Sequence, residues 1–292
     1  MKKLSIIIVN YNTKEILLDC LENLQNSYSN LQVIVVDNGS SDESASSVKK
    51  KYPHVVLIQT TNEGLAKGYN KGLKKANGDY ILFMGTDAFP KKGDLAKMIN
   101  YMDVNPKVGI ATGKLVLRDG TVDMDAHRGF PTPWAAITHF CKLNRIFSSS
   151  KLFNQYFLGY KNINKPHEID ACISHFMLVT KKVFSDVPKW DEDYFLYGED
   201  IDFCYKVKQS GWKVMYLPQF EVLHYKGVSV GIRKQSQDIT RADKHTKIKM
   251  LKRTTESMQI FYKKHYENKY PKIVTRIVFV GIKILGWVRV NL

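Results

Sequence analysis

The chain has 292 residues, of which 44% are hydrophobic and 25% charged, and it carries no low-complexity tract or internal repeat. This composition excludes a disordered or fibrous protein, and the length is sufficient for one large domain with an extension. The cysteines at positions 20, 141, 172 and 204 form no Cys-x-x-Cys pair, so neither a disulfide framework nor a zinc site is predicted and the thiols are expected to be reduced in a cytosolic protein.

Four apolar strands separated by helices are predicted in the first third of the chain. The strands cover residues 4–9, 32–37, 55–58 and 80–84, and the helices cover residues 13–27, 42–52 and 65–77. Continuous apolar strands that alternate with helices indicate a parallel sheet covered on both faces, an open α/β sandwich. The apolar run at the N-terminus is too short for a signal peptide and is assigned to the first strand.

Polar residues follow three of these strands. They are Asn10-Tyr11-Asn12, Asp37-Asn38-Gly39 and Gly85-Thr86-Asp87. Ligands bind beyond the carboxyl ends of the strands in such sheets, so a nucleotide site is expected there. The Gly-x-Gly-x-x-Gly fingerprint and the Walker A pattern are absent from the sequence, which argues against a dehydrogenase or a P-loop enzyme.

The second half has a less regular pattern. Strands are predicted over residues 107–117, 169–180 and 213–217, and helices over residues 200–210 and 240–266, followed by an apolar and basic segment at residues 272–290. Residues 231–292 contain 15 Lys and Arg against 4 Asp and Glu, which is +11 of the total net charge of +16. This local excess predicts an anionic partner for the C-terminal segment.

An ordered series of motifs connects the chain to a known family. The series comprises residues 5–12, 36–42, 62–72, 78–87, 176–179, 197–202 and 211–214, and ends at His224. Over about residues 4–268, the chain resembles family-two inverting glycosyltransferases with the GT-A fold, especially their rhamnosyltransferase-like branch. The resemblance implies an open mixed sheet flanked by helices. It divides the chain into a GT-A domain at residues 1–230, with a Rossmann-like nucleotide-sugar-binding half at 1–105 and an acceptor and catalytic half at 106–230, and a basic helical extension at 231–292.

A nucleotide-diphosphate sugar is the donor that this resemblance implies. The residues expected to contact the nucleotide are Val9, Asn10, Tyr11, Asp37, Asn38, Asn62, Gly64, Asn70 and Thr86. Asp37 would accept a hydrogen bond from the imide nitrogen of uracil or thymine. The alternative is a turn aspartate that binds the backbone of Ser40 or Ser41. Residues 119–121 and 128–131 resemble the rhamnosyltransferase-like branch and favour a dTDP-sugar such as dTDP-L-rhamnose over a UDP-sugar.

Asp87 is the metal-binding carboxylate that the resemblance implies, with His224 as a further ligand. A divalent cation, Mg²⁺ or Mn²⁺, would stabilise the negative charge on the departing nucleotide diphosphate. The family often has Asp-x-Asp at this place, or Asn-Pro-Asp in the rhamnosyltransferase-like branch, whereas Gly85-Thr86-Asp87 supplies one carboxylate. His175 stands where the family usually has a small residue, and either a narrower acceptor pocket or simple repacking explains it.

Asp200, in the segment Glu199-Asp200-Ile201-Asp202, is the general base that the resemblance implies. An inverting transfer needs a carboxylate that takes the proton of the acceptor hydroxyl as its oxygen attacks the anomeric carbon. Glu199 and Asp202 are possible supporting acids, and Asp202 is the second choice for the base. The alternative is that the acids serve the N-terminus of a helix, where negative charge is favoured. The aromatic residues from Trp190 to Tyr197 fit sugar binding and core packing equally well.

The C-terminal segment is expected to lie on a membrane. Lys272, Arg276 and Lys283 fall within about 40° on a helical projection of an otherwise apolar segment, which suits contact of residues 271–292 with anionic lipid. A cytoplasmic enzyme on the inner face of the cell membrane, acting on a glycan or lipid-linked acceptor, is therefore predicted. Packing on the domain or in a homo-oligomer is the alternative for this segment. No nucleic-acid partner is expected, and the competing function is a non-catalytic sugar-nucleotide or glycan-binding module.

Overall fold

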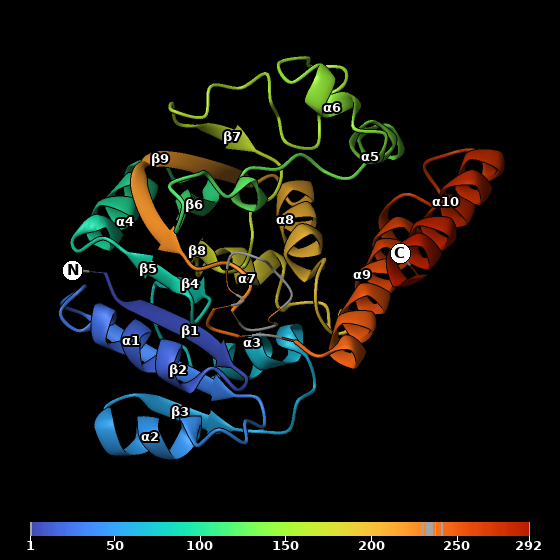
Figure 1. Ribbon diagram of the computed structural model, residues 1–292. Helices are drawn as coiled ribbons and strands as arrows, with labels where there is room; N and C mark the ends of the chain where they lie inside the picture. The colour runs from blue at the N-terminus through green and yellow to red at the C-terminus, as the bar shows by residue number, and fades with distance from the viewer. Residues whose placement is uncertain (1, 229–230, 232–235, 237, 241, 292) are drawn as a thin grey trace.

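A single sheet runs through the protein in the computed structural model, which describes residues 2–228, 231, 236, 238–240 and 242–291 (Figure 1). The strand order is β3-β2-β1-β4-β8-β6-β9-β5, with β7 paired to β9. The strands are β1 (Leu4–Asn10), β2 (Leu31–Asp37), β3 (Val56–Gln59), β4 (Tyr80–Met84), β5 (Ala88–Pro90), β6 (Val108–Leu117), β7 (His167–Ile169), β8 (Phe176–Thr180) and β9 (Lys213–His224). The predicted parallel sheet is confirmed for β1 to β4, and β8 makes the sheet mixed by pairing antiparallel to β4.

Helices cover both faces of the sheet, and a helical pair lies at one side of the domain (Figure 1). The helices are α1 (Lys14–Leu24), α2 (Ser44–Lys51), α3 (Leu65–Leu73), α4 (Asp94–Val104), α5 (Pro133–Phe140), α6 (Leu143–Ile146), α7 (Val183–Asp186), α8 (Glu199–Gln209), α9 (Lys244–His265) and α10 (Lys272–Asn291), with a short 3₁₀ turn at Met124–Ala126. The sequence patterns predicted α1 to α3, α8 and α9, and α10 occupies the expected apolar and basic segment. They missed α4, whose apolar face packs Met98 and Met102 against the sheet core.

Two strand predictions had incorrect bounds. The strand predicted over residues 169–180 is two strands, β7 and β8, which pair with different partners. The strand predicted over residues 213–217 continues to His224, beyond Pro218. The register of β9 against β6 shifts between Leu217 and Glu221, so the proline lies in a bulge, where its missing N–H is tolerated.

The register aligns the polar strand ends at one edge of the sheet. Asn10 at the end of β1 pairs with Asp37 at the end of β2, and β4 lies on the other side of β1. Because β8 runs antiparallel to β4, the residues that precede β8 reach the same edge. The predicted convergence of the strand ends is confirmed, and this edge also receives residues from the second half of the chain.

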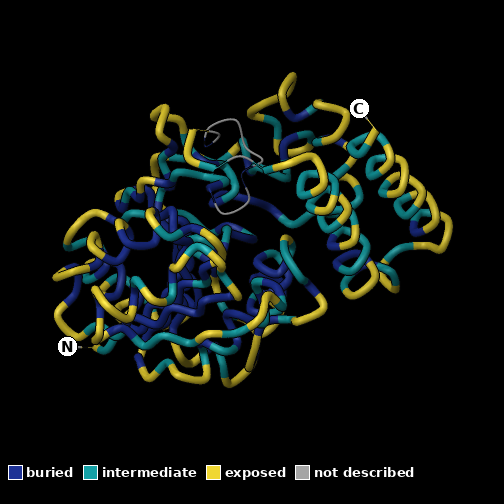
Figure 2. Tube along the Cα trace, turned by 60° about the horizontal axis from the view of Figure 1, so that its bottom comes forward, coloured by how far each residue is buried: buried dark blue, intermediate teal, exposed yellow. Residues whose placement is uncertain are grey.

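α9 and α10 form a pair that packs beside α8 (Figure 1). Tyr205 of α8 contacts the ring of Phe261, and the hydroxyl of Tyr262 lies 3.2 Å from Oγ1 of Thr275 in α10. Buried residues concentrate along the sheet, whereas α10 is mostly exposed or intermediate (Figure 2). Within the described part of the chain, no helix is both long and apolar enough to cross a membrane.

Candidate active site

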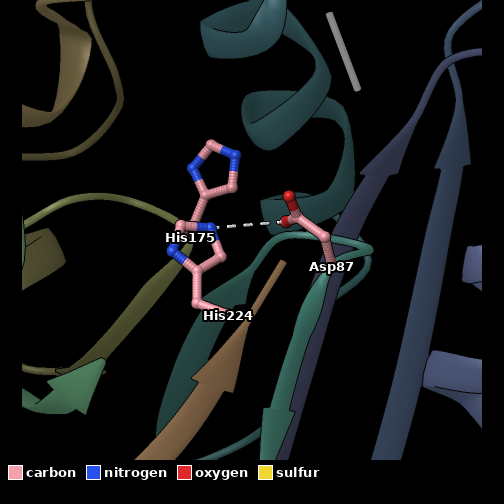
Figure 3. A group of neighbouring side chains, drawn as sticks. All are labelled: Asp87, His175 and His224. Atoms are coloured by element: carbon pink, nitrogen blue, oxygen red, sulfur yellow. Dashed lines mark ion pairs between the residues drawn. The ribbon is translucent and has the colours of Figure 1, made fainter. Parts of the chain in front are cut away.

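Three candidate metal ligands lie together at the edge of the sheet where β1, β2 and β4 end (Figure 3). Asp87, His175 and His224 each place one ligand atom within 4.8 Å of the other two. Nε2 of His224 is 3.6 Å from Oδ1 of Asp87. The structure therefore brings together the two predicted ligands and adds His175, for which the sequence left two explanations open.

Strand pairing explains how His175 reaches Asp87. Met84 at the end of β4 pairs with Phe176 at the start of β8, so His175 lies beside the residues that follow β4. The N–H of Gly85 donates to the carbonyl of His175 at 2.9 Å. A Cβ atom on Gly85 would lie 2.5 Å from Cδ2 of His175 and 2.7 Å from Oδ1 of Asp87. Glycine is therefore required at position 85 for the two side chains to approach each other.

His224 reaches the same point from the end of β9. It pairs with Ala88 in β5, and Asp87 precedes that residue. Nδ1 of His224 lies 2.9 Å from Oδ2 of Asp123, whose other oxygen accepts from Lys226 at 2.5 Å. This carboxylate fixes the ring with Nε2 directed at Asp87, as carboxylates commonly do for metal-binding histidines. The sequence prediction did not include Asp123, although it lies two residues beyond the Asp119–Thr121 turn that was singled out.

The ionisation states in this cluster fit a cation that replaces the proton of His224. Burial opposes the ionised form of Asp87, yet His224 and then His175 lower the pKa of Asp87 to about 2. Burial likewise opposes a charged His224, but Asp87 and Asp123 raise the pKa of His224 to about 9. Both oxygens of Asp87, Nε2 of His224 and Nδ1 of His175 are buried without a hydrogen-bond partner among the described residues. Buried oxygen and nitrogen atoms without hydrogen-bond partners are suitable ligands for a divalent cation.

Asp200 lies in the first turn of α8 and forms a buried ion pair. Its Oδ2 is 2.5 Å from Nη2 of Arg128, and both side chains are 7% exposed. Arg128 is held in turn by two backbone hydrogen bonds to Ala171. The ion pair fixes the orientation of the carboxylate. Residues 128–131 were noted in the sequence only as a family marker, so the pairing of Arg128 with the predicted base is a new feature.

Glu199 connects the start of α8 to the metal-ligand cluster. Its Oε1 accepts from the hydroxyl of Ser174 at 3.4 Å, and Ser174 directly precedes His175. Burial, followed by the charge of Asp200, raises the pKa of Glu199 to about 8. Glu199 is therefore mostly protonated at neutral pH, and this reduces the repulsion between the two adjacent carboxyl groups.

Asp202 faces away from this site, toward α9. Its Oδ1 lies 2.7 Å from Nε2 of His265, and its Oδ2 forms an ion pair with Lys206 at 2.7 Å. The hydroxyl of Tyr194 donates to the same carboxylate at 3.4 Å. These contacts use Asp202 to hold α8 against α9, which favours Asp200 over Asp202 as the base.

The first predicted nucleotide residues form a connected polar group at the ends of β1, β2 and β4. Nδ2 of Asn10 donates to Oδ1 of Asp37 at 2.9 Å and to the hydroxyl of Ser40 at 3.0 Å. Thr13 donates to Oδ1 of Asn10 and lies 3.2 Å from the hydroxyl of Thr86. Oδ2 of Asp37 also accepts from the N–H of Ser40 at 3.2 Å, so the turn role considered for Asp37 is present.

Other predicted nucleotide residues connect α3 and the loop before it to the end of β2 and to the loop that leads to α8. Asn38 donates to Oδ1 of Asn62 and to the carbonyl of Gly64. A Cβ atom on Gly64 would lie 2.4 Å from the carbonyl oxygen of Phe195, so only glycine permits this approach. The amide of Asn70 bonds to both backbone groups of Trp190 and to Glu192. These contacts place the loop that leads to α8 against α3.

Val9 and Tyr11 differ in their surroundings. Val9 packs against Gly68, where an added Cβ would lie 2.9 Å from either methyl group of the valine. Tyr11 is 42% exposed at the end of β1, so its ring is accessible to a ligand. The nucleotide contacts of all nine residues remain predictions.

Trp190 belongs to the core, which decides one of the open alternatives. It is fully buried and stacks on Phe203 with ring centroids 4.5 Å apart. Tyr69 and Phe83 complete this aromatic cluster. Tyr197 is 36% exposed and directly precedes Gly198 and α8. Of the four aromatic side chains from Trp190 to Tyr197, Tyr197 is the most exposed and therefore the most accessible to a ligand.

Known proteins resemble this chain in sequence and in fold. The family model for glycosyl transferase family 2 matches residues 5–187. The chain is 27% identical over 231 residues to rhamnosyltransferase WbbL of Escherichia coli, covering 75% of this chain and 82% of that protein. It is 26% identical over 217 residues to N-acetylglucosaminyl-diphospho-decaprenol L-rhamnosyltransferase of Mycobacterium tuberculosis, covering 69% and 68% of the two chains. A solved structure of GalNAc-T7 with UDP, GalNAc and Mn²⁺ superposes with a TM-score of 0.57 at 14% identity, covering 77% of this chain and 44% of that one.

Proposed function

The chain belongs to glycosyl transferase family 2, and we propose that it is an inverting enzyme that transfers a sugar from a nucleotide diphosphate to a hydroxyl group of a glycan. The observation that carries this proposal is the position of Asp200. It is held by Arg128 at the start of α8, and the adjacent Glu199 contacts the residue that precedes His175. A fixed carboxylate thus lies next to a cluster suited to a cation that binds a diphosphate.

Asp200 acts as the general base in this proposal. It takes the proton of the acceptor hydroxyl while the hydroxyl oxygen forms a bond to the anomeric carbon. The bond from that carbon to the nucleotide diphosphate breaks, and the diphosphate leaves with the electron pair. Arg128 keeps the carboxylate in place, and the protonated Glu199 adds no second negative charge beside it.

Asp87 and His224 would hold the divalent cation. When bound, such a cation stabilises the charge that develops on the departing diphosphate. Asp123 fixes the ring of His224, and the turn at Gly85 brings Asp87 into reach. The polar group around Asn10 and Asp37, at the same edge of the sheet, would receive the nucleotide base.

A dTDP-sugar such as dTDP-L-rhamnose is the donor we propose, with a UDP-sugar as the second choice. Two relatives are rhamnosyltransferases, and the name of one describes a lipid-linked acceptor. A lipid-linked or cell-surface glycan is accordingly the acceptor we propose.

Thermal unfolding of the purified chain with a panel of dTDP-, UDP- and GDP-sugars tests the donor. A donor at about 100 times its Kd should stabilise the fold by about 2.7 kcal/mol. We expect a dTDP- or UDP-sugar to raise the unfolding temperature most, and more with Mn²⁺ or Mg²⁺ than with EDTA. Stabilisation by the GDP-sugars alone would contradict the proposed donor.

The exposed face of α10 supports the proposal of a peripheral membrane contact. Five apolar side chains that follow each other at intervals of four and three residues are each more than half exposed. They are Ile273, Ile277, Val280, Ile284 and Trp287. The exposed basic residues at positions 272, 276 and 283 flank this stripe. An apolar stripe next to basic side chains suits the surface of an anionic membrane.

Replacing Ile277 and Ile284 together by aspartate should weaken binding to anionic vesicles at least about tenfold, because both side chains would no longer enter the apolar layer. Co-sedimentation with phosphatidylglycerol vesicles measures this, and phosphatidylcholine vesicles should bind less. Val104→Asp is the matched control, since Val104 is 77% exposed on α4. Native-like sedimentation of the double variant would contradict membrane contact through α10. A concentration-dependent dimer that this variant abolishes would favour the homo-oligomer instead.

A further inference from the structure

We propose that His175 is a third protein ligand of the metal, and that it makes the site prefer Mn²⁺ over Mg²⁺. This rests on the proposed function, in which Asp87 and His224 hold the cation. Nδ1 of His175 is buried, yet it has no hydrogen-bond partner among the described residues. A ligand atom of this ring lies within 4.8 Å of those of Asp87 and His224 (Figure 3).

The distances are close to those of a loaded site. Two donor atoms that are each about 2.1 Å from one ion can lie at most about 4.2 Å apart. The separation of 3.6 Å between Asp87 and His224 already satisfies this limit. For a pair at the 4.8 Å limit of the cluster, the two atoms must approach by about 0.6 Å to take opposite positions of an octahedron and by about 1.8 Å to take adjacent positions.

The backbone around His175 is arranged for this approach. Gly85 donates its N–H to the carbonyl of His175, and the absence of a Cβ at position 85 lets the imidazole and the carboxylate of Asp87 meet. The rings of His175 and His224 lie 5.5 Å apart between centroids, on the same side of Asp87. Simple repacking would not leave Nδ1 of His175 buried without a hydrogen-bond partner. Both oxygens of the neighbouring Asp87 are also buried without one.

This role compensates for the carboxylate that is absent before Asp87. In the Asp-x-Asp pattern, Gly85 occupies the place of the first acid. A set of two imidazoles and one carboxylate replaces oxygen by nitrogen in the ligand shell. Mg²⁺ prefers oxygen ligands in a near-ideal octahedron, whereas imidazole suits transition metals. Three protein ligands also leave coordination positions open for the oxygens of a diphosphate.

Metal titration of the acceptor-free chain, followed by calorimetry, tests the inference. The native chain should bind Mn²⁺ more tightly than Mg²⁺. His175→Ala should weaken Mn²⁺ binding at least about tenfold, because even the loss of a residue that only orients a ligand costs 10- to 100-fold. The same variant should change Mg²⁺ affinity less, so that the preference for Mn²⁺ narrows. Alanine is a small residue like those usual in the family at this position, so the variant is expected to fold, and thermal unfolding without metal checks this.

Two further variants separate the possible results. His54→Ala removes an exposed histidine outside the cluster and should leave Mn²⁺ affinity unchanged, whereas Asp87→Asn should abolish it. Equal Mn²⁺ affinity of the native chain and His175→Ala overturns the role of His175. The proposal that Asp87 and His224 bind the metal would not be affected. Failure of the native chain to bind Mn²⁺, even with a nucleotide diphosphate present, overturns both the inference and the metal part of the proposed function. Because no acceptor is present, an effect on the acceptor pocket alone would leave these affinities unchanged.

Discussion

Replacing Asp200 by asparagine is expected to lower kcat for sugar transfer by about 10²- to 10⁴-fold, the usual contribution of a general base. The amide has the shape of the carboxylate but is far too weak a base to take the proton of the acceptor hydroxyl. Donor binding should persist, since the predicted nucleotide residues lie on other elements. A transfer assay with a fixed donor measures kcat, and the thermal shift produced by the donor measures binding.

Asp202→Asn is the matched control, because Asp202 lies in the same turn of α8 and is buried to a similar degree. It contacts His265 and Lys206 at the interface with α9. We therefore expect Asp202→Asn to lower the unfolding temperature while each folded molecule transfers sugar at a near-native rate. Native transfer by Asp200→Asn, combined with loss of transfer in Asp202→Asn, would move the role of base to Asp202.

Replacing Arg128 by methionine is expected to lower the free energy of unfolding by about 3–5 kcal/mol. Methionine fills much of the same space but leaves the buried carboxylate of Asp200 without its ion-pair partner. An uncompensated charge in the interior is costly, so most of the loss comes from Asp200 rather than from packing. Urea unfolding followed by circular dichroism measures the change.

A double-mutant cycle tests this explanation. The variant that combines Arg128→Met with Asp200→Asn should be more stable than Arg128→Met alone, because no buried charge is then left unpaired. Arg118→Met is the control for an exposed ion pair, whose side chains are 40% and 56% exposed, and it should cost no more than about 1 kcal/mol. Additive effects of the two substitutions at positions 128 and 200 would show that they do not interact.

Local patterns determined much of the fold. Apolar runs of four or five residues specify β1 to β4, and β1, β2 and β4 are largely buried, as expected of strands inside a parallel sheet. The local sequence patterns gave incorrect strand bounds where pairing between distant strands determines the structure. Pro218 normally ends a strand, but a bulge against β6 accommodates it, so β9 reaches His224. No local signal shows that bulge, because it depends on the register of a strand that lies about a hundred residues earlier.

The sequence by itself determined the family, the parallel half of the sheet, the candidate base and two candidate metal ligands, because these depend on short motifs in a fixed order. The tertiary structure alone decided how their partners are arranged. The antiparallel register of β8 brings His175 to Asp87, and the buried pair with Arg128 separates the role of Asp200 from that of Asp202. Such contacts join residues 70 to 90 positions apart, and strand register and burial, which fix them, are properties of the folded chain.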